Sequence, residues 1–410
     1  MNVIHCRFCE NPLKFIFAHL GMSPLSNSYL AEENLQQMEP FYPLNVFVCD
    51  RCFLVQLPEF EPPEHIFSDY AYFSSYSETW LAHARDYVEQ MTARFALDVQ
   101  SQVIEIGSND GYLLQYFVKQ AIPALGIEPA ENVARVANEA GIPTLTKFFS
   151  QETAKELTFQ NKQADLIVAN NVMAQVPALN DFVAGLKILL KPQGVITIEF
   201  PHLLNLINEN QFDTIYHEHF SYFSFMTAEK ILAKFGLMIF DVDELSTHGG
   251  SLRIYCTHAE NGVELTHERV IGLKYKERAA GFNHLKHYLA FNQKIEQTKR
   301  TLLEFLINAK SRGKSIAGYG APAKGNTLLN YCGIQSDFID YTVDRSPHKQ
   351  NRFLPGTHIP IYHPDKIGDT KPDYVLILPW NLKNEIIEQM KFIRAWGGKF
   401  IVPIPAVEVL

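Results

Sequence analysis

Short apolar runs alternate with segments of helical spacing through the middle of the chain. The apolar runs have the length and residue types of buried strands, and they cover residues 101–107, 124–129, 164–172 and 195–201. Segments that repeat apolar residues every three or four positions predict helices over residues 77–97, 110–120, 131–141 and 178–194, the last of them ending at Gly194. Strands and helices in alternation are typical of an open, mostly parallel sheet with helices on both faces. The sequence therefore predicts a central Rossmann-like α/β domain.

The two ends of the chain follow different patterns. Residues 1–70 are rich in proline and aromatic residues, and 41–60 read as a strand, a cysteine-containing turn and a second strand. So small a segment buries little core of its own, so a cross-link is expected. Near the other end, a long helix over 281–312 precedes a glycine-rich strand–loop–helix unit at 314–333 and further strands. We therefore expect three domains, the last a smaller α/β Rossmann-like domain, with the bounds 1–70, 71–280 and 281–410.

The composition narrows the classes of partner. The chain has 410 residues, of which 47% are hydrophobic and 20% charged, and a net charge of −9. An acidic balance argues against a nucleic-acid-binding or membrane-surface protein, although it leaves room for a basic pocket that binds a small anion. The first residues lack a signal-peptide pattern, and no apolar run approaches the ~20 residues that span a bilayer. We expect a soluble, cytoplasmic protein, and a monomer is compatible with the sequence.

Four of the six cysteines form two Cys-x-x-Cys pairs in the N-terminal domain, Cys6 with Cys9 and Cys49 with Cys52. Two such pairs can close a tetrahedral shell of four sulfurs around zinc, which leaves no open position and predicts a structural role. The alternative is a redox pair or free core cysteines. A redox Cys-x-x-Cys pair normally lies at a strand-to-helix turn, a pattern that residues 1–12 do not have. The spacing therefore favours zinc.

The segment EIGSNDG, residues 105–111, follows an apolar run and opens a predicted helix. Its two glycines allow a tight turn and close approach of a ligand to the backbone. Glu128 ends the next strand, where a carboxylate can accept hydrogen bonds from both ribose hydroxyls of an adenosine. The ligand would be NAD or S-adenosylmethionine, and the alternative is a plain α/β turn without a ligand. The loop departs from the GxGxxG pattern at Asn109 and Asp110, and acidic residues suit a cationic sulfonium better than a pyrophosphate, so S-adenosylmethionine is favoured.

A second glycine-rich loop, GYGAPAKGNTLLN at residues 318–330, joins a strand to a helix in the C-terminal domain. Backbone amides at the start of this helix, together with Lys324, can hold a phosphate, although the segment is not a Walker loop. Asp344 ends the next strand, and a basic patch follows it, made of Arg345, His348, Lys349 and Arg352. A solvated loop without a ligand is the alternative. Glycine and lysine together at a helix N-terminus favour an anion site.

The segment YHEHFSYFS, residues 216–224, gathers imidazoles, a carboxylate and phenols shortly after the apolar run at 195–201. Three interpretations remain open: a metal site, a structural histidine pair, and a general base with its orienting neighbours. His217 and His219 are two residues apart, unlike the histidines of the HExxH zinc helix. Imidazole can take up a proton at neutral pH. Because the carboxyl ends of parallel strands face the ligand crevice, the position near the cofactor favours chemistry over packing.

The segment THGGSLR, residues 247–253, has paired glycines that allow close approach of the backbone. His248, Ser251 and Arg253 are candidate ligand contacts in this segment. A hairpin turn without a ligand is an equally good interpretation of the same residues.

In this order, the motifs resemble those of the nucleotide-sugar C-methyltransferases, three-domain enzymes that make branched deoxysugars. The resemblance covers essentially the whole chain, and it rests on the two Cys-x-x-Cys pairs and on the segments 72–77 (YFSSYS), 105–111, 216–224, 248–253 and 318–330. It implies a structural zinc in the N-terminal domain, S-adenosylmethionine in the middle domain and the nucleotide of a sugar substrate on the C-terminal domain. The active site would lie between the middle and C-terminal domains.

The resemblance also implies roles for single residues. His219 is the expected base, with Tyr216 and Glu218 as neighbours at the reacting centre and Tyr76 as a further candidate. The expected cofactor contacts are Glu105, Gly107, Asn109, Asp110, Gly111, Glu128 and Asn170. The expected substrate contacts are Tyr222, His248, Ser251, Arg253, Gly320, Lys324, Asn326, Asp344 and Lys349.

The substrate that the resemblance implies is a nucleotide-linked 4-keto-6-deoxyhexose, with thymidine diphosphate as the expected nucleotide, methylated at carbon 3. Relatives often carry a histidine in the stretch equivalent to residues 171–182, where this chain has Gln175. That departure predicts a different sugar or a greater reliance on His219. Two other functions compete with this one: a NAD-dependent nucleotide-sugar dehydrogenase, and a zinc-containing sensor that binds nucleotide sugars without turnover. No nucleic-acid or membrane partner is expected.

Overall fold

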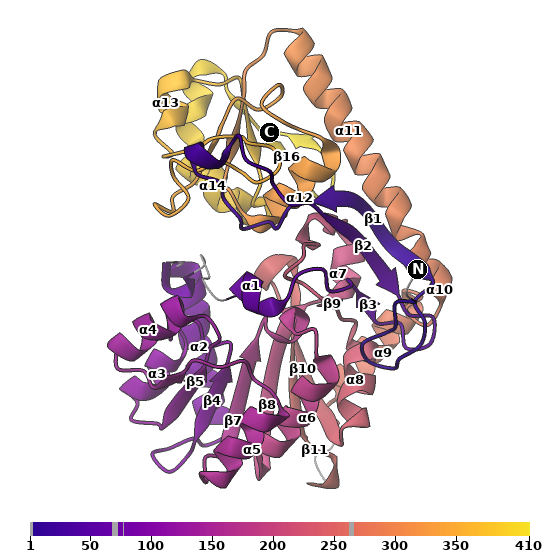
Figure 1. Cartoon of the computed structure of the whole chain (residues 1–410), viewed down its shortest axis with the longest axis vertical. Coiled ribbons are helices and arrows are strands. Elements are labelled where there is room, and N and C mark those ends of the chain that lie inside the picture. Colours follow the sequence, from indigo (N-terminus) through magenta and orange to yellow (C-terminus); the bar gives the residue numbers. More distant parts are fainter. Residues whose placement is uncertain (1–2, 68–72, 77, 262–265) are drawn as a thin grey trace.

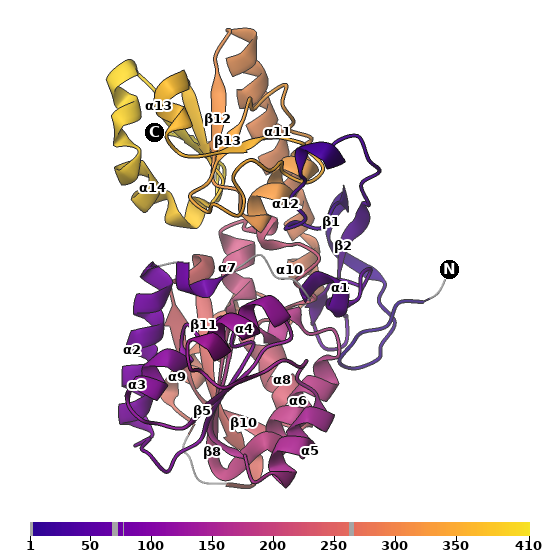
Figure 2. The same ribbon diagram turned by 60° about the vertical axis from the view of Figure 1, so that its left-hand side comes forward.

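The computed structural model describes residues 3–67, 73–76, 78–261 and 266–410. These residues form sheets of four, seven and six strands. Figures 1 and 2 show the seven-stranded sheet in the lower part of the molecule, the six-stranded sheet above it and the four-stranded sheet beside their junction. The predicted three-part α/β architecture is confirmed. The predicted boundary at residue 70 lies outside the described residues, and the one at residue 280 stays a prediction.

The central sheet is the mostly parallel sheet that the alternating pattern predicts. Its strands are β4 (Val103–Ile106), β5 (Ala124–Ile127), β6 (Thr144–Leu145), β7 (Ala164–Asn170), β8 (Leu190–Pro201), β10 (Leu237–Leu245) and β11 (Ser251–His258). They lie in the order β10-β11-β8-β7-β4-β5-β6. Neighbours from β8 to β6 are parallel, whereas β11 is antiparallel to both β8 and β10.

Helices cover both faces of the central sheet. They are α2 (Glu78–Arg94), α3 (Leu114–Lys119), α4 (Glu131–Glu139), α5 (Gln151–Phe159), α6 (Leu179–Leu189), α8 (Phe225–Lys234) and α9 (Glu268–Ala279), whereas α7 (Leu203–Asn208) packs in the core shared with the C-terminal domain. Ile104 and Ile167 pack with α5, α6 and α8 on one face. Val103 and Leu166 pack with α2 and α3 on the other. Successive strand residues point to opposite faces, so strands covered on both sides are apolar throughout.

The helix predicted over residues 178–194 ends early. α6 stops at Leu189, and residues 190–194 already belong to β8. Leu190 pairs with Ala164 of β7, and Pro192 has no amide with which to continue a helix. A Cβ on Gly194 would lie 2.8 Å from the carbonyl oxygen of Ala164. The predicted helix end at Gly194 is therefore wrong, because this glycine lets two strands approach closely instead.

The four-stranded sheet combines the N-terminal segment with a strand from the middle of the chain. Its strands are β1 (Phe15–Ser23), β2 (Tyr42–Val48), β3 (Val55–Gln56) and β9 (Ser221–Tyr222). The pairs β1–β2, β2–β3 and β3–β9 are all antiparallel. The helix α1 (Pro63–Phe67) follows β3 along the chain. Tyr222 lies opposite Val55, so the chain enters the N-terminal sheet directly after residues 216–219. This pairing fixes one end of that segment.

The C-terminal sheet is smaller and parallel except at one edge. Its strands are β12 (Ile316–Tyr319), β13 (Thr342–Val343), β14 (Ile361–Tyr362), β15 (Tyr374–Ile377), β16 (Lys399–Val402) and β17 (Glu408–Val409), in the order β14-β13-β12-β15-β16-β17. The helices are α12 (Ala323–Cys332), α13 (Lys366–Thr370) and α14 (Lys383–Gln389). Only the pair β16–β17 is antiparallel.

The long helix predicted over residues 281–312 is divided in the structure. A short α10 (Leu285–Leu289) precedes α11 (Phe291–Ser311), and α11 runs beside β1 (Figure 1). The backbone amide of His19 on β1 donates to Asn292 Oδ1 on α11 at 2.9 Å. None of the helices in the described part of the chain is long and apolar enough to cross a bilayer.

Candidate functional site

A cavity of about 760 Å³ opens where the carboxyl ends of the central strands face the C-terminal domain. Residues that end or directly follow β4, β5, β7 and β8 line one side, and residues of the C-terminal domain line the other. Ten of the predicted site residues line it: Gly107, Asn109, Glu128, Asn170, Tyr216, Glu218, His219, His248, Lys324 and Lys349. Its volume lies within the range of about 300–1,000 Å³ typical of small-molecule sites.

The loop after β4 has the left-handed backbone that its glycines permit. The φ angles of Gly107 and Gly111 are 68° and 78°. A Cβ on Gly107 would lie 2.4 Å from Cγ2 of Val172, and one on Gly111 would lie 2.4 Å from Cδ1 of Ile142. Gly107 lines the cavity, whereas Gly111 packs behind it. Both glycines are therefore required by packing, and Gly107 is the one placed to approach a ligand.

Two acceptor side chains face the cavity beside this loop. Glu128 accepts hydrogen bonds from the backbone amides of Asn109 and Ala130, each at 2.9 Å. Burial raises the pKa of Glu128, and these two amides oppose the rise. Each carboxylate oxygen has a second lone pair, so Glu128 can also accept from a ligand. Asn170 Oδ1 is buried and has no hydrogen-bond partner among the described residues, which adds a further acceptor.

Asn109 and Asp110 form hydrogen bonds with the segment at residues 74–75. Asn109 Oδ1 accepts from the amide of Ser74 at 2.9 Å. Asp110 Oδ2 accepts from the amide and the hydroxyl of Ser75 at 3.1 and 2.5 Å. Asp110 and Glu105 do not line the cavity, and burial raises the pKa of Glu105 well above its ordinary value. The carboxylate that the loop region presents to a ligand is therefore Glu128 rather than Asp110.

The two histidines of residues 216–219 have different surroundings. His217 Nε2 lies 3.3 Å from the carbonyl oxygen of Pro43, and its ring packs edge-on against Tyr42 at 5.8 Å. His219 instead lines the cavity. Among the residues that the structure describes, only the cysteine cluster brings three or more potential metal ligands together. The metal interpretation of this motif is therefore not supported, and His217 is a packing residue.

The contacts of His219 define its tautomer and its charge. Its Nδ1 lies 3.1 Å from the carbonyl oxygen of Thr214 and must carry the proton, because a carbonyl oxygen only accepts. Nε2 is then the nitrogen with the lone pair. Burial lowers the pKa of His219 to about 4, the hydrogen bond to the Thr214 carbonyl opposes this shift, and electrostatic interactions with His248 and Lys324 add smaller contributions to it. The imidazole is therefore neutral at pH 7 and keeps a free lone pair on Nε2, although the same lowering of its pKa makes it a weaker base.

The other catalytic candidates differ in burial and in whether they line the cavity. The ring of Tyr216 lies 4.1 Å from the ring of His219. Glu218 is 4% exposed, and its Oε1 accepts from Asn27 Nδ2 at 2.6 Å. Tyr76 is 67% exposed, does not line the cavity and packs beside His348 of the C-terminal domain at 5.9 Å. Residues 72 and 77 of the same expected motif lie outside the described part of the chain.

The segment 247–253 covers the hairpin turn between β10 and β11 and the first residues of β11, and its His248 reaches the cavity. His248 has a φ of 53° and lines the cavity, 5.1 Å from the ring of Trp80. Thr247 Oγ1 and Arg253 Nη2 both donate to Glu199, each at 2.9 Å. Burial would raise the pKa of Glu199, but His83 and Arg253 lower it to about 2. Arg253 therefore serves as a buried counter-ion within the sheet.

Two lysines of the C-terminal domain line the cavity, Lys324 from the glycine-rich segment at 318–330 and Lys349 from the segment after β13. Lys324 Nζ donates to Asn381 Oδ1 at 2.8 Å and lies 4.7 Å from the ring centre of Trp380. Lys349 Nζ donates to the carbonyl oxygen of Ala321 at 2.9 Å. Asp344 accepts from the amide of Ala321 at 2.8 Å and does not line the cavity. The C-terminal domain thus presents lysines, rather than Asp344, to the cavity.

Nine predicted contact residues do not line the cavity: Glu105, Asp110, Gly111, Tyr222, Ser251, Arg253, Gly320, Asn326 and Asp344. Tyr222 is buried in β9, Ser251 donates to the carbonyl oxygen of Thr247, and Asn326 donates to that of Ser26. Ligand contacts by these residues stay predictions. Conversely, the lining residues Asn27 and Trp80 have no motif around them, and only their proximity in the fold reveals them.

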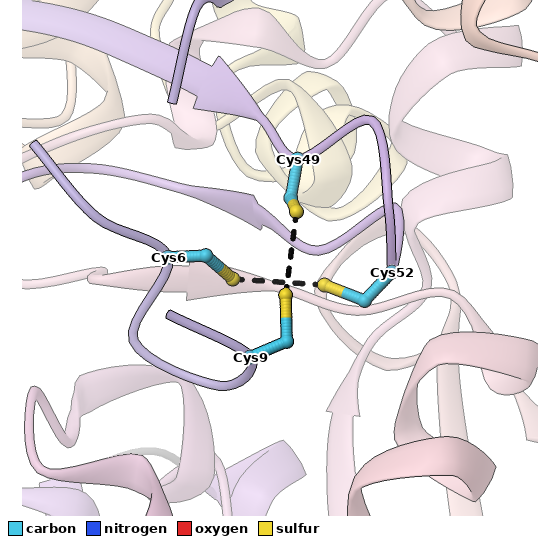
Figure 3. Close-up of side chains that lie close together, drawn as sticks. All are labelled: Cys6, Cys9, Cys49 and Cys52. Carbon is cyan, nitrogen blue, oxygen red and sulfur yellow. Dashed lines mark hydrogen bonds between the residues drawn. The ribbon is translucent and has the colours of Figure 1, made fainter. Parts of the chain in front are cut away.

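The four N-terminal cysteines form a compact cluster (Figure 3). The Sγ atoms of Cys6 and Cys52 are 3.6 Å apart, those of Cys9 and Cys49 are 3.5 Å apart, and all four lie within 4.8 Å of one another. A tetrahedral zinc site with Zn–S bonds of about 2.3 Å requires sulfur–sulfur separations of about 3.8 Å. The short contacts join cysteines of different pairs. The geometry fits the predicted structural zinc, and not two separate redox pairs.

Three family models match the chain. A "Putative zinc binding domain" matches residues 6–67, a "Methyltransferase domain" matches 80–242 and a "C-methyltransferase C-terminal domain" matches 246–405. A curated protein, the C-methyltransferase NovU of Streptomyces niveus, is 34% identical over 405 residues. That match covers 99% of this chain and 96% of NovU.

Solved methyltransferase structures resemble less than half of the chain, and only distantly. The magnesium protoporphyrin IX methyltransferase of Synechocystis, solved with S-adenosylhomocysteine, is 14% identical with a TM-score of 0.36, covering 43% of this chain and 83% of its own. An S-adenosylmethionine-dependent methyltransferase of Clostridium acetobutylicum is 11% identical with a TM-score of 0.35, covering 42% of this chain and 90% of its own.

Proposed function

The chain belongs to the C-methyltransferase family that the full-length relative and the family models define, and we propose that it methylates carbon 3 of a nucleotide-linked 4-keto-6-deoxyhexose. Its dependence on S-adenosylmethionine follows from the family. The observation that carries the proposal is that the neutral base His219 faces the same cavity as Glu128 and Lys324. The competing dehydrogenase function is not supported, because the matched family is one of methyltransferases.

The residues at the carboxyl ends of the central strands provide groups that suit S-adenosylmethionine. The carboxylate of Glu128 can accept from the ribose hydroxyls, while Gly107 allows the backbone to approach the ligand. The buried Oδ1 of Asn170 needs a donor, which the ammonium group of the ligand can provide. When bound, S-adenosylmethionine supplies an electrophilic methyl group, which the nucleophilic carbon of the sugar takes up.

His219 would create that nucleophilic carbon. The hydrogen beside a ketone is weakly acidic, and Nε2 of His219, which keeps its lone pair because Nδ1 bonds Thr214, would remove it. The electron pair left behind becomes an enolate, whose oxygen needs a hydrogen-bond donor or a positive charge. We assign the donor role to Tyr216, which lies against His219, rather than to the exposed Tyr76. Glu218 completes the polar wall beside the base.

Lys324 and Lys349 are the groups proposed to hold the diphosphate of the nucleotide. Both line the part of the cavity that belongs to the C-terminal domain. Burial lowers the pKa of Lys324, so a bound anion would restore the stability of its charged form. A sugar tethered there would extend toward His219, and thymidine diphosphate is the nucleotide that we propose. Holding donor and acceptor in one cavity supplies the entropic part of the rate enhancement.

Deuterium exchange tests the proposed chemistry directly. The protein would be incubated in heavy water with thymidine-diphospho-4-keto-6-deoxyglucose, with and without S-adenosylmethionine, and the sugar nucleotide analysed by mass spectrometry. We expect a gain of one methyl group with the donor and uptake of one deuterium without it, because the base acts before methyl transfer. Recovery of unchanged sugar in both reactions, with thymidine, cytidine and guanosine diphosphate sugars alike, would contradict the proposal.

Replacement of Glu128 by glutamine is expected to weaken binding of S-adenosylhomocysteine by about 10- to 100-fold, because a charge-assisted hydrogen bond of about 1.5–3 kcal/mol is lost. Isothermal titration calorimetry would measure this change. Asp110→Asn is the matched control, since Asp110 lies outside the cavity and bonds Ser75. Equal losses in the two variants would show that the loop, rather than the Glu128 carboxylate, determines affinity.

A further inference from the structure

A loop of the N-terminal domain reaches the catalytic cavity. Asn27 lines the cavity together with Glu218 and His219. Its Nδ2 lies 2.6 Å from Oε1 of Glu218, although the two residues are 191 positions apart in the sequence. An ionised carboxylate only accepts hydrogen bonds, so the amide nitrogen of Asn27 is the atom that must face it. This contact joins the zinc-binding domain to the segment that carries the base.

The residues on either side of Asn27 are anchored to the C-terminal domain. The carbonyl oxygen of Ser26 accepts from Asn326 Nδ2 on α12 at 2.5 Å. The hydroxyl of Tyr29 lies 2.6 Å from the carbonyl oxygen of Ala321 and 3.3 Å from Oδ1 of Asn27. The loop is therefore fixed both before and after Asn27, and the amide has little freedom to turn away from Glu218.

The same anchoring continues beyond the loop. Leu30 pairs with Phe353 through two backbone hydrogen bonds, of 3.0 and 2.9 Å. Glu39 accepts from the amide of Gly356 at 2.8 Å and contacts His358 at 3.0 Å. Figure 1 shows this part of the N-terminal segment, in indigo, lying against the C-terminal domain. Asn27 thus belongs to the N-terminal domain and is held in place by the C-terminal domain, whereas His219 lies in the middle domain.

We propose that Asn27 is a positioning residue for methyl transfer, which holds the Glu218 carboxylate beside His219 by donating one neutral hydrogen bond. The inference rests on the proposed function, in which Glu218 forms the wall next to the base. A neutral donor fixes the carboxylate without removing its negative charge, whereas a lysine or arginine would neutralise it. The N-terminal domain would then form a third wall of the active site, in addition to binding zinc.

The test compares Asn27→Ala, Asn27→Asp and the control Asn292→Ala. Asn292, at the start of α11, accepts a backbone hydrogen bond from β1 and so also joins the N-terminal domain to the rest of the protein, but it does not line the cavity. The kcat and KM for thymidine-diphospho-4-keto-6-deoxyglucose would be measured with S-adenosylmethionine from pH 5.5 to 8.5. Melting temperatures would be measured for all variants.

We expect Asn27→Ala to lower kcat by about 10- to 100-fold, as misplacement of a reacting group does, with the KM for S-adenosylmethionine changed less than twofold. In Asn27→Asp two carboxyl groups would face each other and could not both ionise. The aspartate donates only while protonated, so its kcat relative to wild type should fall as the pH rises. A merely structural role would lower melting temperature without changing the pH profile.

The possible outcomes separate this inference from the proposed function. If the wild-type protein neither exchanges deuterium nor methylates any sugar nucleotide, the proposed function fails and the role of Asn27 fails with it. If the wild type is active but both Asn27 variants keep kcat within twofold and the wild-type pH profile, only this inference is overturned. A loss of kcat in Asn292→Ala as large as in Asn27→Ala would also overturn it.

Discussion

Replacement of His219 by asparagine should lower turnover by about 10²- to 10⁴-fold, the usual contribution of a general base. Asparagine keeps an N–H that can donate to the carbonyl oxygen of Thr214, the bond that His219 Nδ1 makes at 3.1 Å, so the fold should survive. It has no lone-pair nitrogen to replace Nε2. Methylated product formation and deuterium uptake without donor should both be lost, because both require removal of the same proton.

His217→Asn is the matched control for this experiment. The substitution removes the other imidazole of the motif, which contacts Pro43 and Tyr42 outside the cavity. It should lower the melting temperature and leave turnover within about threefold of wild type, because no reacting group moves. Comparable loss of turnover in the two variants would contradict the assignment of the base to His219.

The pH dependence of the wild-type enzyme gives the same test without a mutation. Burial lowers the pKa of His219 to about 4, so the base form of the free enzyme persists well below the ordinary value of about 6.5. Protonation removes the base, so kcat/KM should fall only as the pH drops toward 4. A fall centred near pH 6.5 that persists in His217→Asn would contradict the lowered pKa of His219.

Local patterns in the sequence predict those parts of the fold that local interactions determine. Apolar strands at 101–107 and 164–172 are recognisable because both faces of the central sheet are covered. The two-residue strands β3 and β9 have no periodicity to recognise, and their pairing depends on the position of the whole N-terminal domain. The helix end predicted at Gly194 fails for a similar reason, since pairing with β7 overrides local propensity.

The candidate site could be predicted only to the level of residue type. A carboxylate after β5 and a base near 216–219 follow from the position of strand ends. The strand ends do not predict which carboxylate lines the cavity, because hydrogen bonds from Ser75 hold Asp110 outside it. Arg253 is likewise directed by Glu199, its partner across the β8–β11 pairing. Asn27 reaches Glu218 across domains, and no sequence spacing encodes that contact.

Loss of zinc is the second change expected to have a large effect. The four cysteines come from two short turns, and the second turn, at Cys49 and Cys52, connects β2 directly to β3. Structural zinc contributes about 10–16 kcal/mol to the folding of small zinc-binding peptides, so a domain of this size should not fold stably without it. Cys49→Ala should therefore lower the melting temperature of the N-terminal domain strongly and abolish bound zinc, measured by elemental analysis.

The same change should also lower turnover, although no cysteine lies in the cavity. β3 pairs with β9 directly after His219, and the N-terminal domain carries Asn27 against Glu218. Both contacts are lost when that domain unfolds. Cys256→Ala is the matched control, because Cys256 is fully buried in β11 and takes no part in the sulfur cluster. It should retain zinc and cost roughly 1–2 kcal/mol of stability through the small cavity left. A zinc-free Cys49→Ala protein with wild-type melting temperature and turnover would refute the structural role of the metal.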